Sequence, residues 1–389
     1  MSVYSSSEFI SHVSPHNGEP LVADTPDLLS DGELLWPVVD GIVYLRPRHD
    51  LREQAVALLQ SDRKQEALIV LLQDQDRFAP LPPPHPHDLQ ALVADGNTSN
   101  LRQAMQQLNY GPVADYFAYR GATPTFLSGL ALLQQTVRTE QPVVEVACGI
   151  GHFLRVLEAQ GIATVGIDVV FSKLWLARRY LGVQGTLVCA DIERRPPLVT
   201  ERPHSVFCHD AFYFFEHKTD ALHSLREMAS GGNLAIGHVH TDAIDHGVAG
   251  YPLSIATYRR MATRGAAFFD DVSLVSAWLE QGQAQPQNND ELEHAEAIAW
   301  VEGETNQELF PLTQPVASLS LNPLLEVDER EAAIRWPSER FREEYEAEAA
   351  YLQLSSEETA LLNSPEQMSE EQKTDLYRRR ILLDLPSTW

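Results

Sequence analysis

The chain has 389 residues, of which 44% are hydrophobic and 22% are charged. This composition supplies enough apolar side chains for a sizeable core and excludes a chain that is disordered throughout. The 55 acidic and 29 basic residues give a net charge of −26. Because nucleic acids are bound mainly through Lys and Arg, the sequence predicts no nucleic-acid partner.

The three cysteines, Cys148, Cys189 and Cys208, lie far apart and form no CxxC pair. We therefore expect reduced thiols and neither a zinc site nor a disulfide framework. The N-terminus lacks the features of a signal peptide, and no apolar run reaches the length of a membrane span. These features favour an acidic cytoplasmic protein without a membrane partner. A homodimer is compatible with the sequence, which does not determine the oligomeric state.

The N-terminal part of the chain is predicted to hold a small α+β module between two polar segments. Residues 1–30 are polar and are expected to form a flexible arm. Within the module, residues 31–78, a hairpin with its turn at Asp40-Gly41 precedes helices over 51–59 and 64–73. Residues 79–104 are read as a linker and a helix, because the prolines of 80–87 exclude a helix or a central strand.

Residues 105–260 carry the pattern of a parallel α/β sheet. Apolar runs that suit strands buried on both faces alternate with helical segments. The expected strands are 142–148, 163–168, 185–190, 204–209 and 233–239, and the expected helices are 100–107, 124–136, 151–160, 171–181 and 219–230. The sequence therefore predicts a Rossmann-like sheet with helices on both faces.

The C-terminal region, residues 261–389, is predicted to complete this sheet and to form a substrate lid. We expect helices over 265–279 and 338–352, a loop over 281–295, and late strands over 297–301 and 316–321. Between Asp290 and Trp389 there are 23 acidic and 8 basic residues. This excess is typical of a solvated face, and it also suits a docking surface.

The most informative stretch runs from residue 143 to 168. A strand ends in the tight turn Cys148-Gly149-Ile150-Gly151, which opens a helix, and a second strand ends at Asp168. Glycines allow the backbone to approach a ligand closely, and a carboxylate at the next strand tip can accept hydrogen bonds from ribose hydroxyls. Leu154 stands where a dinucleotide-binding GxGxxG would have its third glycine. We expect this leucine to hold the helix away from the strand. Glu145 is an acid within an apolar strand and needs a donor partner.

These residues resemble the motifs of class I S-adenosylmethionine (SAM)-dependent methyltransferases. Glu145 to Gly151 (EVACGIG) is similar to their first motif, with Ala147 where many members have glycine, and Asp168 matches the acid that holds the ribose. Asp191 and Ile192 match the residues that flank the adenine, and the stretches 209–212 and 215–217 resemble the fourth-strand region. The resemblance covers roughly residues 105–245. It implies SAM as the cofactor, bound by Tyr119, Arg120, Glu145, Ala147, Gly149, Gly151, Asp168, Val169, Asp191, Ile192, His209 and Asp210.

The module 31–78 also has a familiar pattern. Its stretch WPVVDGIVYLR resembles the zinc-ribbon-like activator module that accompanies some methyltransferases. The metal-binding cysteines of that module are absent here. The resemblance therefore implies a packing role without metal.

Methyl transfer needs an aligned nucleophile and, for a hydroxyl or ammonium, a general base. His217 and His238 are our candidates, because histidine titrates near neutrality. His217 also suits a structural helix start. The group His238, His240, Asp242, Asp245 and His246 has no familiar metal-binding spacing, so we predict no metal.

The sequence thus predicts a SAM-dependent methyltransferase acting on an O or N atom of a small-molecule acceptor. Two alternatives remain open: an NAD-dependent oxidoreductase and a non-catalytic methyltransferase-like scaffold subunit. The aromatic cluster Tyr116, Phe117 and Tyr119 with Arg120 suits either a core or a cover over the cofactor.

Overall fold

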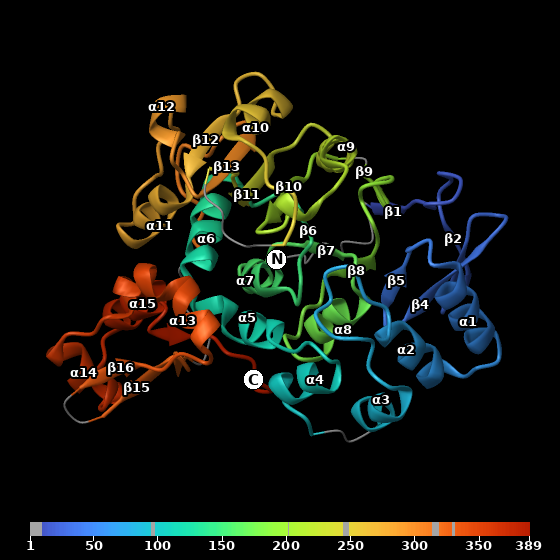
Figure 1. Cartoon of the computed structure of the whole chain (residues 1–389), viewed down its shortest axis with the longest axis horizontal. Helices are drawn as coiled ribbons and strands as arrows, with labels where there is room; N and C mark the ends of the chain where they lie inside the picture. Colours follow the sequence, from blue (N-terminus) through green and yellow to red (C-terminus); the bar gives the residue numbers. More distant parts are fainter. Residues whose placement is uncertain (1–9, 95–97, 201, 244–248, 313–318, 329–330) are drawn as a thin grey trace.

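The computed structural model describes residues 10–94, 98–200, 202–243, 249–312, 319–328 and 331–389 (Figure 1). Its centre is an eleven-stranded sheet in the order β12-β13-β11-β10-β6-β7-β8-β5-β4-β3-β2. The strands are β2 (Val22–Thr25), β3 (Leu28–Ser30), β4 (Leu35–Val39), β5 (Ile42–Tyr44), β6 (Val143–Val146), β7 (Thr164–Asp168), β8 (Thr186–Cys189), β10 (Ser205–His209), β11 (Leu234–His240), β12 (Ala267–Asp270) and β13 (Ala297–Glu302).

The middle of the sheet is parallel, from β11 through β10, β6, β7 and β8 to β5. Helices α7 (His152–Ala159), α8 (Phe171–Arg179) and α9 (Lys218–Ala229) connect its strands. The chain runs outward from β6 to β8 and then returns to β10 on the other side of β6. Ligands of open α/β sheets bind at the carboxyl ends of the strands beside such a reversal. The predicted fold class is confirmed.

Alternate side chains of the central strands enter two separate cores. Val143, Phe207 and Leu187 belong to one core, which also contains residues of α7, α8, α6 (Pro124–Thr136) and α11 (Asp271–Leu279). Val144 and Val165 belong to the other, together with residues of α9 and α10 (Ile255–Met261). The sheet therefore has helices on both faces, as expected.

The N-terminal strands extend the sheet (blue in Figure 1). The hairpin of β4 and β5 turns at Asp40 and Gly41, both with positive φ, and helices α1 (His49–Gln60) and α2 (Lys64–Leu72) follow it. These predictions are confirmed. β5 then pairs in parallel with β8, from Ile42 opposite Leu187 to Tyr44 opposite Cys189. The module 31–78 and the central strands therefore share one hydrogen-bonded sheet.

The expectation of a flexible arm is wrong for residues 10–30. β1 (Ile10–His12) pairs with β9 (Leu198–Thr200), and β2 and β3 form the end of the large sheet. All four residues of β2 are exposed, so this strand has no apolar alternation that sequence analysis could detect. Residues 1–9 lie outside the described residues.

The segment before the central strands is helical. It contains α3 (Pro86–Val93), α4 (Leu101–Gln107) and α5 (Val113–Tyr119). Pro86 and His87 were expected in the linker but form the first turn of α3, because the first helical position requires no N–H donor. The predicted helices 100–107 and 124–136 are confirmed as α4 and α6.

The C-terminal region completes the sheet with β12 and β13 and then crosses to α5 and α6 (red in Figure 1). The helix expected over 265–279 is instead β12 followed by α11, because Phe268 and Phe269 pair with Trp300 and Ala299 of β13. Residues 289–292, expected in a loop, form α12 (Asn289–Leu292). The segment 338–352 forms α13 (Glu339–Tyr345) and a 3-10 helix.

Of the strand expected over 316–321, only β14 (Ser320–Leu321) is seen, and residues 316–318 lie outside the described residues. Later elements are β15 (Leu325–Val327), β16 (Ala332–Ile334), α14 (Ser356–Leu362), α15 (Glu370–Arg378) and β17 (Leu382–Leu383). None of the described helices combines the length and apolar character that a membrane span requires.

Candidate functional site

In the turn after β6, three of five consecutive residues have a left-handed backbone conformation. Ala147, Gly149 and Gly151 have φ values of 56°, 56° and 83°. A Cβ at Gly151 would lie 2.9 Å from Val183 Cγ2, so this position also needs glycine for space. Ala147 has a side chain in a conformation that costs roughly 1–2 kcal/mol for an L-residue. The turn is therefore strained at the position where the resembling family often has glycine.

Asp168 at the end of β7 holds this turn. Its Oδ2 accepts a 2.9 Å hydrogen bond from the Gly149 N–H, and its Oδ1 accepts one of 2.9 Å from the Val170 N–H. Lys173 Nζ lies 3.5 Å from Oδ1. Burial lowers the pKa of Lys173, but the nearby carboxylates of Asp168 and Asp76 outweigh it, so the net shift is upward. Asp168 thus remains next to a cation.

An aromatic ring covers the glycine turn. A Cβ at Gly149 would lie 3.0 Å from Phe117 Cε1, and Lys173 Nζ lies 5.7 Å from the centroid of the same ring. Phe117 comes from α5, within the aromatic cluster noted in the sequence. The ring packs directly on the backbone that the sequence predicts for ligand binding.

Leu154 does not hold α7 away from the sheet as expected. A Cβ at Gly166 in β7 would lie 2.5 Å from Leu154 Cδ1. The glycine of the neighbouring strand therefore leaves the space that the leucine fills. Helix α7 and strand β7 therefore pack closely, with the large residue on the helix and the glycine on the strand.

Glu145 is a buried acid in β6. Its side-chain Oε2 has no hydrogen-bond partner among the described residues. Burial raises its pKa well above the usual value. A buried, unpartnered oxygen next to the glycine turn is the kind of group that a bound ligand satisfies.

The tips of β7 and β8 carry the remaining predicted cofactor residues. The carbonyl of Val169 accepts a weak bond from Cys189 Sγ at 3.6 Å, and Asp191 Oδ1 accepts one from the Glu193 N–H at 3.0 Å. Ile192 is buried. These residues lie at the same carboxyl edge of the sheet as Asp168, because β7 and β8 are parallel neighbours.

A second polar group lies at the carboxyl ends of β10 and β11. We call it the Asp210 cluster, and it comprises Tyr116, Arg120, Asp210, Tyr213, His238 and Asp271. The hydroxyls of Tyr116 and Tyr213 donate to Asp210 Oδ2 and Oδ1 at 2.7 and 2.8 Å. Arg120 Nη1 lies 3.0 Å from Asp210 Oδ2. His238 lies between two carboxylates, with Nδ1 2.9 Å from Asp271 Oδ2 and Nε2 4.0 Å from Asp210 Oδ1.

The cluster fixes the charges of its members. Burial would raise the pKa of Asp210, but the charges of Arg120 and His238 hold it well below its usual range. Burial would lower the pKa of His238, but Asp271 and Asp210 raise it to about 9. His238 is therefore an imidazolium at neutral pH, and it lies between the side chains of Asp271 and Asp210.

Backbone strain marks the same place. Asp210 and His238 have φ values of 56° and 46°. The pairing of β11 with β13 is irregular between Ile236 and Val239, and such a bulge changes the direction in which a side chain points. Strained residues of this kind gather at functional sites.

The other predicted residues fall in different surroundings. His209 is buried between Arg120 and Ser128, and burial holds its pKa well below the usual value, so it is neutral. His217 is exposed at the start of α9, outside the buried Asp210 cluster. The ring of Tyr119 contacts Phe341 and Trp389 of the C-terminal region.

Sequence reasoning missed Asp271, Tyr213 and Lys173. Asp271 lies at the start of α11, where the expected helix over 265–279 hid the boundary between strand and helix. The signal that could have revealed it was the pair Asp270-Asp271 before an apolar helical run, which is typical of a helix N-terminus.

Asp210, His238 and His240 could together hold a metal ion, since one ligand atom from each lies within 4.8 Å of the others. The Arg120 guanidinium at 3.0 Å from Asp210 opposes this, because a second cation would be repelled. The absence of a metal therefore remains our prediction.

Comparison with known proteins bears on the segment that carries the glycine turn. Residues 144–236 match the model of a family described as "Methyltransferase domain". This segment is similar to a methyltransferase domain, and we refer to it by that name below. It runs from β6 to β11 and contains the glycine turn, Asp168, Asp191 and Asp210. The match indicates SAM as the cofactor, as predicted.

No curated protein matches the chain in sequence. Among solved structures, a chain of the complex between the Haloferax volcanii Trm112 methyltransferase activator and a methyltransferase is 19% identical, with a TM-score of 0.37, covering 49% of this chain and 92% of that one. Phosphoethanolamine N-methyltransferase 2 of Haemonchus contortus is 13% identical (TM-score 0.36; 52% and 58% covered). A TehB-like SAM-dependent methyltransferase of Corynebacterium glutamicum is 16% identical (TM-score 0.34; 46% and 87% covered). Similarity at this level gives no information about the acceptor of the methyltransferase domain.

Proposed function

We propose that the protein transfers the methyl group of SAM to an O or N atom of a small-molecule acceptor. The observation that supports this most strongly is the hydrogen bond between the Gly149 N–H and Asp168 Oδ2. It joins the glycine turn and the strand-tip acid within the methyltransferase domain, beside the reversal of strand order. The net charge of −26 favours a small acceptor over a nucleic acid.

The residues at β6 to β8 suit the cofactor. Asp168 would accept hydrogen bonds from the ribose hydroxyls, and Asp191 and Ile192 would flank the adenine. Glu145 offers a buried oxygen without a partner. SAM supplies an electrophilic methyl group when bound, and the protein has to align the acceptor and exclude water. Phe117, which already packs on Gly149, is placed to exclude water.

The Asp210 cluster suits the acceptor. It lies at the carboxyl ends of β10 and β11, next to the glycine turn of β6 in the sheet order. Tyr116, Tyr213 and Arg120 hold Asp210 in a fixed position. The pair of His238 and Asp271 can take up and hold a proton at Nε2. Because the pKa of His238 is raised to about 9, it would act as a base only in its minor neutral form at pH 7.

His217 remains a second candidate for the base. Its exposure leaves it open to solvent and to an acceptor that reaches α9. The structure provides no carboxylate partner for its ring among the described residues, in contrast to His238.

We also propose that the module 31–78 is a permanently attached structural support for the methyltransferase domain. It contains no cysteine, so the zinc site of the resembling activators is absent. Its strand β5 covers the edge of β8, whose tip carries Asp191. We also propose a cytoplasmic location and a homodimer for this acidic protein.

Calorimetric titration with S-adenosylhomocysteine tests the proposed function. We expect saturable binding to the full-length protein and no binding of NAD. Binding of NAD alone would support the oxidoreductase. Binding of S-adenosylhomocysteine with no transfer of labelled methyl to any extract fraction would support the scaffold subunit.

A further inference from the structure

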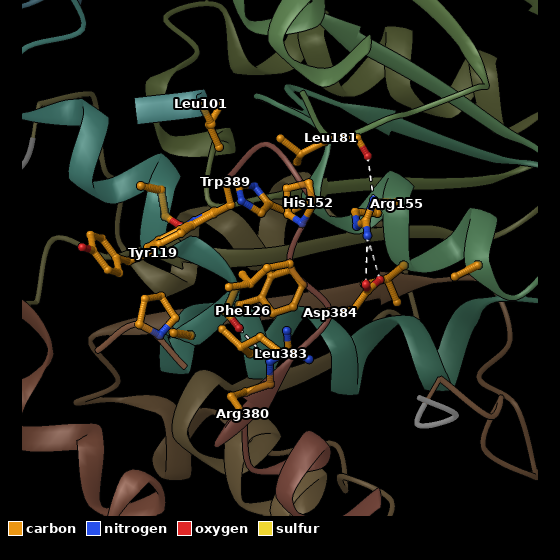
Figure 2. Close-up of a pocket in the computed structure, with 18 of the residues that line it drawn as sticks. Leu101, Tyr119, Phe126, His152, Arg155, Leu181, Arg380, Leu383, Asp384 and Trp389 are labelled. Carbon is orange, nitrogen blue, oxygen red and sulfur yellow. Dashed lines mark hydrogen bonds and ion pairs between the residues drawn. The ribbon is translucent and has the colours of Figure 1, made fainter. Parts of the chain in front are cut away.

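A small cavity of about 50 Å³ lies between the helices of the central region and the C-terminal segment (Figure 2), and His152, which follows the glycine turn, is part of its lining. The walls come from α5, α6 and α7 on one side and from α15 and residues 380–389 on the other. This volume has room for roughly three to five water molecules, or for one small organic anion. None of Gly149, Asp168 and Asp210 lines it.

Arg380 is the unusual residue of this cavity. It is only 5% exposed, and its guanidinium lies over the rings of Phe126 and Tyr377, 5.2 and 4.9 Å from their centroids. Its Nε donates a 2.7 Å hydrogen bond to the carbonyl of Gly121. Its Nη1 is buried and has no hydrogen-bond partner among the described residues. Figure 2 shows the guanidinium beside Phe126 on the cavity wall.

The other charges of the cavity do not compensate Arg380. Asp384 is the one acidic residue among those that line it, and both its oxygens accept from Arg155 Nη2 at 2.9 Å. Burial and the nearby charges of Arg120 and Arg380 lower the pKa of His152 to about 3, so its ring is neutral. Among the described residues the cavity therefore carries one positive charge in excess.

A buried charge without a partner destabilises a fold by several kcal/mol, so it is retained where a ligand supplies the partner. A guanidinium binds a carboxylate through two parallel hydrogen bonds. One excess charge matches a monoanion, and the aromatic and aliphatic walls match an apolar body. Tyr119, Phe126, Leu383 and Trp389 provide these walls (Figure 2).

We propose that this cavity is a binding site for the carboxylate of a small organic acid, with Arg380 as its anchor. The carboxylate binds Nη1 and Nη2, and the apolar part of the acid packs on the aromatic walls. Its lining shares Tyr119 with the residues that the sequence resemblance assigns to SAM, but the proposal does not rest on the proposed function.

Propionate and its uncharged counterpart propionamide are the probes. Each is titrated into the full-length protein at constant ionic strength, and binding is followed by calorimetry and by the melting temperature. We expect saturable binding and a rise in melting temperature with propionate, and neither with propionamide.

Arg380→Met removes the charge and retains most of the volume. We expect it to weaken propionate binding at least about tenfold, as the loss of a charge-assisted hydrogen-bonding partner implies. Its melting temperature without ligand should not fall, because an unpaired buried charge has been removed. Arg342→Met is the matched control, since Arg342 is half-buried, lies outside this cavity and is paired with Glu339 and Glu346. This variant should bind propionate like the parent protein.

Equal responses to propionate and propionamide would overturn the proposal, as would unchanged propionate binding in Arg380→Met. If Arg380→Met does not fold, Arg380→Lys decides. Lysine keeps the charge but loses the two parallel bonds, so weaker binding supports the proposal and unchanged binding contradicts it.

Discussion

The N–H of Gly149 donates a 2.9 Å hydrogen bond to Asp168 Oδ2, which joins the turn after β6 to the tip of β7. The two residues are 19 positions apart. This bond fixes the distance between the glycine turn and the acid that we assign to the ribose. Any ligand that spans both must therefore match a preformed spacing.

We expect Asp168→Asn to weaken the binding of S-adenosylhomocysteine at least about tenfold, because an amide offers one acceptor oxygen in place of two. Calorimetric titration measures this. Asp220→Asn, in the exposed first turn of α9, is the control and should bind like the parent protein. Equal affinities for the two variants would contradict the assignment of Asp168.

Ala147→Gly should stabilise the protein by about 0.5–1 kcal/mol. The substitution removes a backbone strain of roughly 1–2 kcal/mol that Ala147 has at φ 56°. Against this, glycine gives the unfolded chain more conformational entropy, which costs about 0.5–1 kcal/mol on folding. The free energy of unfolding in urea measures the difference. Ala159→Gly, in the last turn of α7, has no such strain and should destabilise instead.

His238 should make stability depend on pH. Its pKa is raised from 6.5 to about 9, so its contribution is fully present below pH 6.5 and is lost as the pH rises through 9. The loss amounts to about 3 kcal/mol at most. His238→Gln should remove this decrease, whereas His223→Gln on the exposed face of α9 should retain it. Urea unfolding from pH 6 to 10 compares the three proteins.

The same group gives a kinetic prediction. If His238 is the base, turnover should rise with pH with a midpoint near pH 9. Asp271→Asn should move this midpoint to lower pH, because one of the two carboxylates that raise the pKa is removed. Initial rates across the pH range measure the midpoint. A midpoint that Asp271→Asn leaves in place would favour another base.

Breaking the ion pair of Arg120 and Asp210 should cost about 3–5 kcal/mol, because Arg120→Met leaves a buried carboxylate without its cation. The double variant Arg120→Met/Asp210→Asn should recover part of this loss. Denaturant unfolding of the single and double variants gives the coupling free energy between the two side chains. Strictly additive effects would show that the two charges do not stabilise each other.

Val43→Asp tests whether the N-terminal module unfolds with the methyltransferase domain. Val43 is buried in β5 between Val38 and Val188, so a carboxylate there destabilises the shared sheet. We expect one calorimetric transition at a lower temperature. Val22→Asp, on the exposed strand β2, should leave the transition unchanged. A separate early transition would show that the module is independent.

The sequence predicted the central fold well, because strands buried on both faces and amphipathic helices leave strong patterns. The strands β6, β7, β8, β10 and β11, with helices α7, α8 and α9, lie where the sequence pattern placed them, whereas β9 was not predicted. Elements whose structure depends on distant partners were missed. β2 is wholly exposed, and β12 is a strand because Phe268 and Phe269 pair with β13.

For the candidate site, the sequence carried signals for single residues but not for the contacts between them. Gly149 and Asp168 carry local signals, namely a turn and a strand end. The Asp210 cluster instead unites residues from α5, the ends of β10 and β11, and the start of α11. Nothing near Asp271 in the sequence shows that it contacts His238, since 33 positions separate them. The prediction for Leu154 was wrong for the same reason, namely that it depends on a residue distant in the sequence. Gly166 of β7 leaves the space that the Leu154 side chain fills.

Strand β5 pairs with the edge of β8, and a shortened protein would lack this pairing. Without residues 10–45, β8 would present a bare row of backbone donors and acceptors along an apolar strand, which invites self-association. In the intact chain the sheet ends instead on β2, a short polar strand that carries Asp24. Expression trials should therefore keep the N-terminal strands if a monodisperse sample is wanted.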